Sequence, residues 1–330
     1  MGYCGNAVII PEPQLLAEKT CFDLASLTKP LATTLAILAL VEDGSLALGE
    51  RLPQLLARKV PDEKAVITLG QLLGHSSGLI GHRPFFREIA KVEKGARSEA
   101  MLEALLAEPL VAEPGKKAVY SDLGFLLLGW IVERRSGMRL DAFVHERIYQ
   151  PLGLEYSLFF RPLEEPPPPE KKFAATEACP WRDRVMYGEV SDENTYVLGG
   201  VAGQAGLFGD LESVVHLVSH LLDCWQGRAR HPAFSNEALR FFLTRDASIP
   251  GSTRTLGFDT PSANDSSAGK FFHPTSIGHL GFTGTSFWID PTRDLAIVLL
   301  SNRVHPDRAN EKIKKFRPFF HNGVMESLRL

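Results

Sequence analysis

The stretch FDLASLTKPLATTLAILAL, residues 22–40, constrains the fold more than any other part of the sequence. The residues after Lys29 are mostly apolar on every side, so a helix formed by them must lie in a hydrophobic core. Gly44 stands where a helix-ending glycine is expected, which predicts a helix over residues 26–43. The first turn of this helix nevertheless contains a polar pair, Ser26 and Lys29, in the pattern S-x-x-K.

The spacing of Ser26 and Lys29 suggests chemistry. Residues three positions apart share a helix face, so the lysine amine points back over the serine hydroxyl. A lysine desolvated at the positive end of a helix would have a lowered pKa and could accept a proton. The alternative is a capping serine followed by a solvated lysine. The pattern alone discriminates weakly, because Ser267 and Lys270 match it in a polar loop.

Helical patterns occupy the middle of the chain and strand patterns its two ends. Strands are expected at Ala7–Ile10 and in a hairpin around the turn DPTRD. We therefore predict an α+β fold in which one antiparallel sheet, built from both termini and flanked by helices, receives an inserted helical lobe. The predicted sheet lobe comprises residues 1–24 and 246–330, the helical lobe residues 25–245, and the active site lies in the cleft between them. Helices are expected from residue 69 to HSSG, at 98–107, 123–137, 140–154 and 210–225 with Asp210 as cap, and in the tail 310–330.

Composition excludes several classes of protein. The chain is 44% hydrophobic with a formal net charge of -3, so no basic excess indicates nucleic acid. The apolar run Leu35–Val41 is too short for a transmembrane segment. No signal peptide precedes it, which predicts a cytoplasmic protein as written, or a periplasmic one if the true start lies upstream with an export signal. No metal or cofactor is expected, because the cysteines are scattered without C-x-x-C: Cys4, Cys21, Cys179 and Cys224.

Other stretches place the S-x-x-K pattern in a context. They are HSSGL from His75, YSDLG from Tyr120, GGVAGQAG from Gly199 and GHLGFTGTSFWIDP from Gly278. With these motifs in this order, the chain from Phe22 to Arg303 resembles the serine β-lactamase and penicillin-binding protein superfamily, in its class C-like, esterase-like branch. That family has S-x-x-K at a helix start, Y-x-N or Y-S-x on a loop, and K-T-G or H-x-G on a strand. The matching residues are Ser26-Leu27-Thr28-Lys29, Tyr120-Ser121-Asp122 and His279-Leu280-Gly281.

The resemblance implies a covalent mechanism. Ser26 would attack a carbonyl and form an acyl-enzyme, while Lys29 and Tyr120 share the proton transfers. Tyr120, with an ordinary pKa near ~10, would need a cation such as Lys29 nearby to act as a base, and which of the two is the base stays open. The backbone N–H groups of Ser26 and Phe282 would form the oxyanion hole. Gln204, in a close-packed loop beside the cleft, could contact the substrate.

Three departures from the family pattern concern the substrate. Asp122 replaces an asparagine, and an ionised carboxylate cannot donate a hydrogen bond to an amide carbonyl. Leu280 replaces a hydroxyl residue beside Gly281, and His279 replaces a lysine, with a charge that would depend on pH near ~6.5. We therefore predict a poor β-lactamase that acts on an ester, an amide or a D-amino-acid peptide, with a weak preference for a less anionic substrate.

Several alternatives remain at this level. An idle relative could bind peptidoglycan-like peptides or a protein partner, although it would have no chemical reason to keep Ser26, Lys29 and Tyr120 together. His75 is interpreted as structural, and SDEN at 191–194 as a solvated turn. Only one short strand precedes the serine, which predicts an exposed sheet edge unless a second copy, in a homodimer, or upstream residues cover it.

Overall fold

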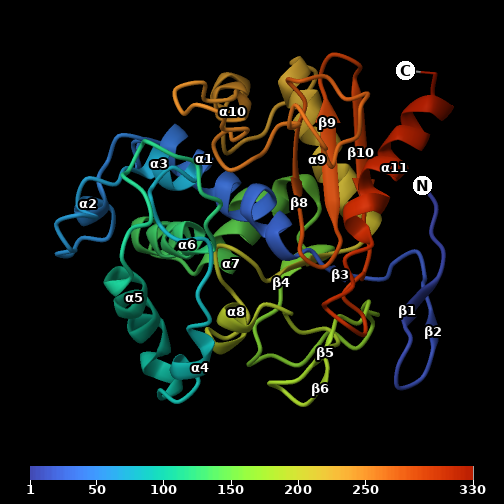
Figure 1. Cartoon of the computed structure of the whole chain (residues 1–330), viewed down its shortest axis with the longest axis horizontal. Helices are drawn as coiled ribbons and strands as arrows, with labels where there is room; N and C mark the ends of the chain where they lie inside the picture. The colour runs from blue at the N-terminus through green and yellow to red at the C-terminus, as the bar shows by residue number, and fades with distance from the viewer. Residues whose placement is uncertain (330) are drawn as a thin grey trace.

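The computed structural model describes residues 1–329 and confirms a mixed fold of helices and antiparallel sheets. Figure 1 shows the sheet β8–β9–β10 on one side of the molecule and helices α2 to α5 on the other. The helices are η1 (Ala25–Leu27), η2 (Lys29–Thr33), α1 (Thr34–Glu42), α2 (Leu52–Leu55), α3 (Leu69–Leu73), α4 (Phe86–Ile89), η3 (Lys94–Ala96), α5 (Arg97–Ala107), α6 (Asp122–Ser136), α7 (Leu140–Val144), η4 (His145–Tyr149), η5 (Gln150–Leu152), α8 (Glu193–Val197), α9 (Leu211–Gln226), α10 (Asn236–Leu243) and α11 (Ile313–Ser327). The strands are β1 (Asn6–Val8), β2 (Gln14–Leu15), β3 (Phe22–Asp23), β4 (Leu158–Phe160), β5 (Ala178–Cys179), β6 (Arg184–Val185), β7 (Leu207–Gly209), β8 (Ile277–Leu280), β9 (Ser286–Asp290) and β10 (Leu295–Leu299).

The predicted core helix is confirmed, with an irregular start. A 3₁₀ turn (η1) and a π-helical turn (η2) precede α1, and all seven residues from Thr34 to Leu40 are buried. The stretch Ala25–Glu42 has 18 residues and a mean hydropathy of 1.3, so by length and composition alone it could cross a membrane. The sequence analysis considered only the apolar run Leu35–Val41, which is shorter than the helical stretch seen in the structure. In the fold, 83% of the stretch is buried inside the protein, as expected of a core helix.

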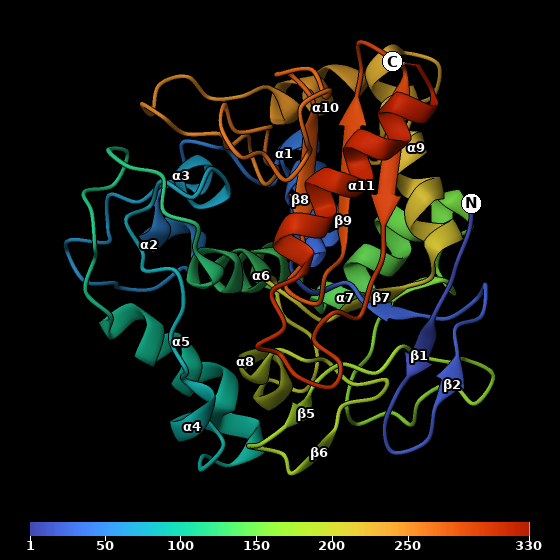
Figure 2. The same ribbon diagram turned by 45° about the vertical axis from the view of Figure 1, so that its right-hand side comes forward.

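The C-terminal sheet has the order β10–β9–β8, and all its pairs are antiparallel. Side chains alternate between its faces, so Trp288 and Ile297 pack under α11 while Phe287 and Ile289 join the main core beside α9. Figure 2 shows α11 and α9 on opposite sides of this sheet. The predicted hairpin and tail helix are confirmed; the tail prediction also included Leu330, which lies outside the described residues.

The prediction that both termini build one sheet is wrong. Strand β1 pairs with β2 in a separate hairpin, in the register Asn6↔Leu15. Pro11 and Pro13 have no backbone N–H and cannot extend a strand ladder, so the chain turns back on itself after Ile10. Within residues 1–329, β10 therefore has β9 as its only strand partner. A homodimer through the free edge of β10 stays a prediction.

A smaller sheet that the sequence did not reveal, β3–β7–β4, sets the approach to the core helix. Its strands have two or three residues, too few for a recognisable alternation. Strand β3 ends directly before η1, and β7 follows the glycine-rich segment 199–206. The pair β3–β7 thus brings the start of the core helix beside that segment.

Helix α6 and the glycine-rich segment approach each other backbone to backbone. A Cβ atom at Gly203 would lie 1.9 Å from the Phe125 carbonyl oxygen, and one at Gly129 would lie 2.9 Å from the Gly203 nitrogen. Thr33 donates a hydrogen bond to the Gly203 carbonyl oxygen at 2.7 Å. Only glycine fits at this crossing. This agrees with the prediction from the sequence that the glycine-rich segment is a close-packed loop.

We predict that Gly203→Ala destabilises the protein by about 1–3 kcal/mol, because the added methyl group must push α6 and the segment apart. Thermal and urea unfolding would measure the change. Gly49→Ala is the matched control, since a Cβ there meets no atom within 4 Å. Equal stability of the two variants would contradict the close crossing.

Candidate active site

Ser26 lies at the mouth of the core helix, directly after a strained residue. Ala25 has φ 49°, in the left-handed region that residues other than glycine rarely adopt. The Asp23 carboxylate accepts a hydrogen bond from the Ala25 N–H at 2.8 Å and another from the Ser191 N–H at 2.7 Å. Burial raises the pKa of Asp23 to about 7, while these two N–H groups act in the opposite direction. Asp23 thus ties the turn before Ser26 to the segment around Ser191.

The end of strand β8 packs against the same turn. A Cβ atom at Gly281 would lie 2.0 Å from Thr285 Oγ1 and 2.8 Å from the Leu24 carbonyl oxygen, so this position excludes a side chain. Thr285 Oγ1 itself donates to that Leu24 oxygen at 3.1 Å. The glycine of the H-x-G motif therefore lets β8 approach Ser26.

Lys29 is fully buried, and its ammonium group contacts three different segments. Nζ donates hydrogen bonds to Ser26 Oγ at 3.0 Å, to Asp122 Oδ1 at 2.7 Å and to the Gln204 carbonyl oxygen at 3.1 Å. These three acceptors match the three N–H donors of an ammonium group. The S-x-x-K serine and lysine therefore meet as the spacing predicts.

The predicted direction of the Lys29 pKa is wrong. Burial acts to lower it, but the charge of Asp122 and the contact with Tyr120 raise it more, and the net shift is upward. Asp122 shows the converse: burial acts to raise its pKa, and Lys29 and His82 bring it down to about 2. The sequence argument considered desolvation without the partner carboxylate. In the resting site, Lys29 is a cation that donates to Ser26.

Tyr120 lies between the two sides of the cleft. Its ring centre is 5.0 Å from Lys29 Nζ, 5.0 Å from the Arg254 guanidinium, 4.6 Å from the His75 ring centre and 5.9 Å from that of His279. The buried His75 accepts a hydrogen bond on Nδ1 from the Ser121 N–H at 3.0 Å, which holds the start of α6. This contact supports a structural role for His75.

His279 is uncharged in this site. Its side chain is buried, and burial together with the charges of Arg254 and Lys29 lowers its pKa well below the ordinary value. The expected charge change near neutral pH is therefore not supported. Nδ1 lies 2.9 Å from the Leu280 carbonyl oxygen, and Nε2 has no partner within residues 1–329.

Ser26 and Phe282 line the same space, as an oxyanion hole requires. Among residues 1–329, neither backbone N–H donates a hydrogen bond to the protein. Both groups are thus free for a substrate oxygen, although their roles stay a proposal. The Phe282 side chain is 45% exposed at the entrance.

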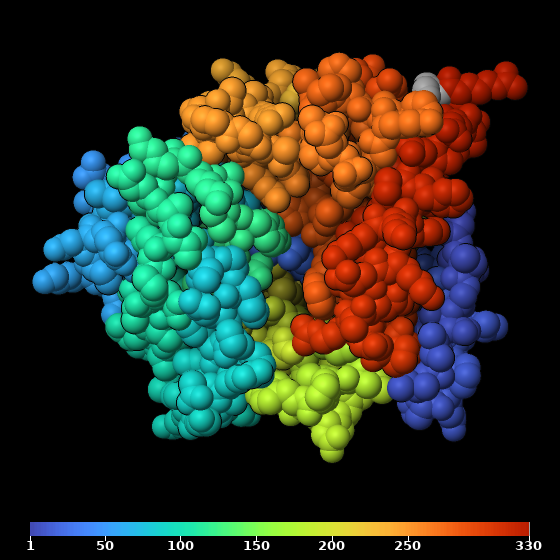
Figure 3. Space-filling model, viewed as in Figure 1, coloured from blue at the N-terminus to red at the C-terminus, as the bar shows by residue number. Residues whose placement is uncertain are grey.

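The cleft has two halves that meet at Ser26, Tyr120 and Phe282; one is richer in carboxylates (the acidic half) and the other in cations (the basic half). The acidic half, about 310 Å³, is lined by His82, Asp122, Asp192, Glu193, Gln204 and Arg308, among others. The basic half, about 420 Å³, is lined by Arg254, Asp259, His279, Leu280, Arg303, Lys314 and Arg317, among others. Figure 3 shows a hollow at the centre of the molecule, where the N-terminal, yellow-green and C-terminal segments meet.

The interpretation of SDEN as a solvated turn is wrong. Asp192 caps α8 by accepting a hydrogen bond from the Thr195 N–H at 2.7 Å. Ser191, Glu193 and Asn194 are buried, with exposed fractions of 3%, 8% and 1%. The segment packs against the nucleophile turn through Asp23 and forms the wall of the acidic half.

One buried cluster has donor atoms spaced for a metal ion. Glu177, Cys179 and Glu193 place ligand atoms within 4.8 Å of one another. Arg182 already contacts Glu177 at 3.3 Å and Cys179 Sγ at 3.1 Å, and Arg308 binds Glu193. Two guanidinium groups therefore take the positions of a cation, and the cluster is better explained as an ion-pair network.

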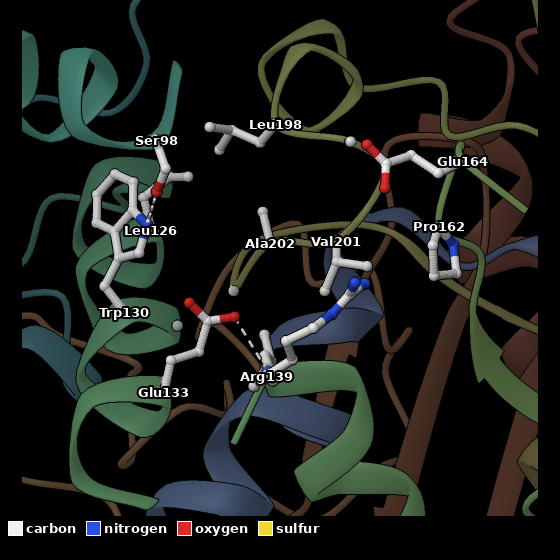
Figure 4. Close-up of a pocket in the computed structure, with 14 residues that line it drawn as sticks. Ser98, Leu126, Trp130, Glu133, Arg139, Pro162, Glu164, Leu198, Val201 and Ala202 are labelled. Carbon is white, nitrogen blue, oxygen red and sulfur yellow. Dashed lines mark hydrogen bonds between the residues drawn. The ribbon is translucent and has the colours of Figure 1, made fainter. Parts of the chain in front are cut away.

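A further cavity of about 250 Å³ lies behind the glycine-rich segment (Figure 4). Trp130 Nε1 donates to Ser98 Oγ at 2.9 Å, and Glu133 accepts a hydrogen bond from the Leu140 N–H at 3.1 Å. Gly203 forms part of its wall, next to Gln204, which faces the acidic half on the other side. The cavity is therefore separate from the cleft at Ser26.

Sequence reasoning missed several residues of the cleft: Asp23, His82, Asp192, Arg254, Arg303 and Arg317. His82, Arg254, Arg303 and Arg317 lie outside the short motifs, and Asp23 lies in the opening stretch without a feature that marks its role. Asp192 was visible as part of SDEN but had no feature to separate it from a surface turn.

Comparisons with known proteins agree with this geometry. A sequence model of the family described as Beta-lactamase matches residues 11–317. A protein of Salmonella agona (strain SL483) named "Putative D-alanyl-D-alanine carboxypeptidase" is 30% identical, over 93% of this chain and 75% of its own length. A protein of Escherichia coli (strain K12) with the same name is 32% identical, over 91% and 73%. Among solved structures, unliganded simvastatin synthase from Aspergillus terreus shares the fold, with a TM-score of 0.71, 21% identity and coverage of 98% of this chain and 88% of its own.

We predict a pH-dependent effect of Asp122→Asn. With a folded-state pKa of about 2, below its ordinary value, Asp122 stabilises the fold above about pH 4, and this contribution is lost as the pH falls through 2. The stability difference between the native protein and the variant should shrink by about 2 kcal/mol from pH 5 to pH 2. Urea unfolding across this range would measure it. Asp141→Asn, at an exposed ion pair, is the control, and a difference independent of pH would refute the assignment.

Proposed function

Because the chain belongs to the β-lactamase family and is a serine hydrolase, we propose that it removes the C-terminal residue of peptides that end in a D-amino acid, through an acyl-enzyme on Ser26. The observation that best supports this proposal is the contact of Lys29 Nζ with Ser26 Oγ, next to Tyr120. A catalytically idle binding protein is not favoured by the family or by the names of the relatives.

The geometry supports one division of the proton transfers. Asp122 keeps Lys29 in its ammonium form, so Lys29 holds and polarises the Ser26 hydroxyl rather than accepting its proton. Tyr120 is then the group left to take the proton, and the nearby ammonium stabilises the charge that it acquires. The N–H groups of Ser26 and Phe282 would stabilise the oxyanion.

The basic half favours a substrate with a carboxylate. Four cationic side chains, Arg254, Arg303, Lys314 and Arg317, face one carboxylate, Asp259. Arg317 has no carboxylate partner within residues 1–329; it donates to the carbonyl oxygens of Gly281 and Thr285, at 2.7 and 2.8 Å.

Burial lowers the pKa of Arg317 only to about 10, so it is charged at neutral pH. The weak expectation of a less anionic substrate rested on Leu280 alone. These four cations, which come from three separate segments, outweigh it. Arg254 is paired with Asp259, and Lys314 with Glu311. Arg303 and Arg317 have no carboxylate partner among residues 1–329, and a terminal carboxylate of the substrate would supply one.

An esterase is the second candidate. Leu280 and the half-exposed Phe282 give the entrance of the basic half an apolar edge that suits an ester alcohol. Strong β-lactamase activity is not expected, because the ionised Asp122 cannot donate a hydrogen bond to a β-lactam side-chain carbonyl.

We predict that Ser26→Ala abolishes both the burst of p-nitrophenol from p-nitrophenyl acetate and covalent labelling by a fluorescent penicillin, because no acyl-enzyme can form. Stopped-flow absorbance and gel fluorescence would record the two signals. Ser267→Ala is the matched control, since Ser267 begins the second S-x-x-K pattern but lies outside the cleft. Equal bursts from Ser26→Ala and the native protein would reject the nucleophile.

We also predict that the enzyme prefers N-acetyl-D-Ala-D-Ala over its C-terminal amide by at least tenfold in kcat/KM. Arg254→Gln should reduce this preference severalfold, because it removes a cation and leaves Asp259 unpaired. Using a ratio of two substrates cancels general damage to the site. Arg293→Gln, at the β9–β10 turn, should keep the native ratio; a native enzyme that prefers the amide would contradict carboxylate recognition.

A further inference from the structure

The acidic half has charges that the proposed carboxypeptidase mechanism does not use. Three carboxylates, Asp122, Asp192 and Glu193, face a cavity in which Arg308 and His82 are the cations. The basic half has the opposite balance, and Ser26 lies where the two halves meet. Carboxylates are therefore concentrated on one side of Ser26, and unpaired cations on the other.

Two of the three carboxylates of the acidic half use only one oxygen within the protein, whereas Asp122 uses both, because its Oδ2 also lies 3.6 Å from His82 Nδ1. Asp122 Oδ1 binds Lys29, Asp192 Oδ1 caps α8, and Glu193 Oε1 binds Arg308. The second oxygens of Asp192 and Glu193 have no hydrogen-bond partner among residues 1–329. They are available to a ligand that donates hydrogen bonds.

Gln204 supplies an independent indication of such a ligand. Its Nε2 donates to Thr195 Oγ1 at 2.8 Å and to Asp192 Oδ1 at 3.2 Å. Because a carboxylate oxygen can only accept, this contact fixes the orientation of the amide. Gln204 Oε1 is then left buried, with no partner in the described part of the chain, and the side chain is only 2% exposed. A buried acceptor without a donor is costly, and an N–H group of a ligand would satisfy it.

We propose that the acidic half binds a free ammonium group on the residue whose carbonyl Ser26 attacks, so that the preferred substrates are short zwitterionic peptides such as free D-amino-acid dipeptides. The proposal rests on the proposed function for the carboxylate in the basic half. A dipeptide has an extended length of about 7 Å. Its ammonium and its carboxylate lie on opposite sides of the single peptide bond. With that bond at Ser26, the ammonium would lie in the acidic half and the carboxylate in the basic half.

The electrostatics of Asp192 agree with an incoming cation. Burial and the nearby charge of Asp122 raise the pKa of Asp192, which means that the empty site holds this negative charge at a cost. An ammonium group between Asp192 and Gln204 would offset that cost. In a peptide extended at its N-terminus, a neutral amide stands in the place of the ammonium group. The carbonyl oxygen of that amide would be repelled by the carboxylates of the acidic half.

The test compares D-Ala-D-Ala with N-acetyl-D-Ala-D-Ala on the native enzyme, Asp192→Asn and Asp210→Asn. Asparagine caps helices as well as aspartate does, so Asp192→Asn changes the charge and keeps the cap of α8. Asp210→Asn makes the same change at the cap of α9, away from the cleft. The native enzyme should favour the free dipeptide at least tenfold in kcat/KM. Asp192→Asn should reduce this ratio at least fivefold, and Asp210→Asn should keep it.

The possible failures can be told apart. Equal or faster hydrolysis of the acetylated peptide by the native enzyme overturns the ammonium site and leaves the carboxypeptidase proposal in place. An unchanged ratio in Asp192→Asn also overturns it. If neither peptide is hydrolysed, the carboxypeptidase proposal fails. The ammonium site is then tested with the p-nitrophenyl esters of D-alanine and N-acetyl-D-alanine, which the same Ser26 would attack. The ratio of kcat/KM for the free ester to that for the acetylated ester takes the place of the peptide ratio.

Discussion

A buried ammonium group with three acceptors holds this active site together. Lys29 comes from the core helix, Asp122 from the start of α6, and the Gln204 carbonyl from the glycine-rich segment. A charge in the protein interior is strongly destabilising unless it is paired and fully hydrogen-bonded, so all three segments must reach the same point in the folded chain. The close approach of Gly203 to α6 is part of the same arrangement, because it brings the third acceptor within reach.

The sequence could predict the parts of the site that are local. The apolar helix with Ser26 and Lys29 needed only residue spacing, and the motifs around Tyr120 and His279 indicated which distant segments join it. The pKa of Lys29 could not be predicted in this way, because its direction depends on whether Asp122 lies at 2.7 Å or farther away. Local motifs gave the residues that meet at Ser26, and only the tertiary structure gave the charge state of Lys29.

Errors in the fold prediction have similar causes. The strand at Ala7–Ile10 has the right composition to join the main sheet, but two prolines turn the chain back after it. The segment SDEN has the composition of a surface turn, and it is buried because Asp23 and Arg308 bind it from distant parts of the sequence. The composition of a short segment indicates what that segment prefers in isolation. Its strand partner or its burial depends on the neighbouring residues and on distant parts of the chain.

Asp23 connects the nucleophile to the acidic half of the cleft. One of its oxygens fixes the strained Ala25 directly before Ser26, and the other fixes Ser191 directly before Asp192. A single buried carboxylate thus sets the distance between the attacking hydroxyl and the proposed ammonium site. Neither side can shift without breaking a hydrogen bond to this buried carboxyl group. The position proposed for the substrate's ammonium group and the position of the Ser26 hydroxyl are therefore coupled through Asp23.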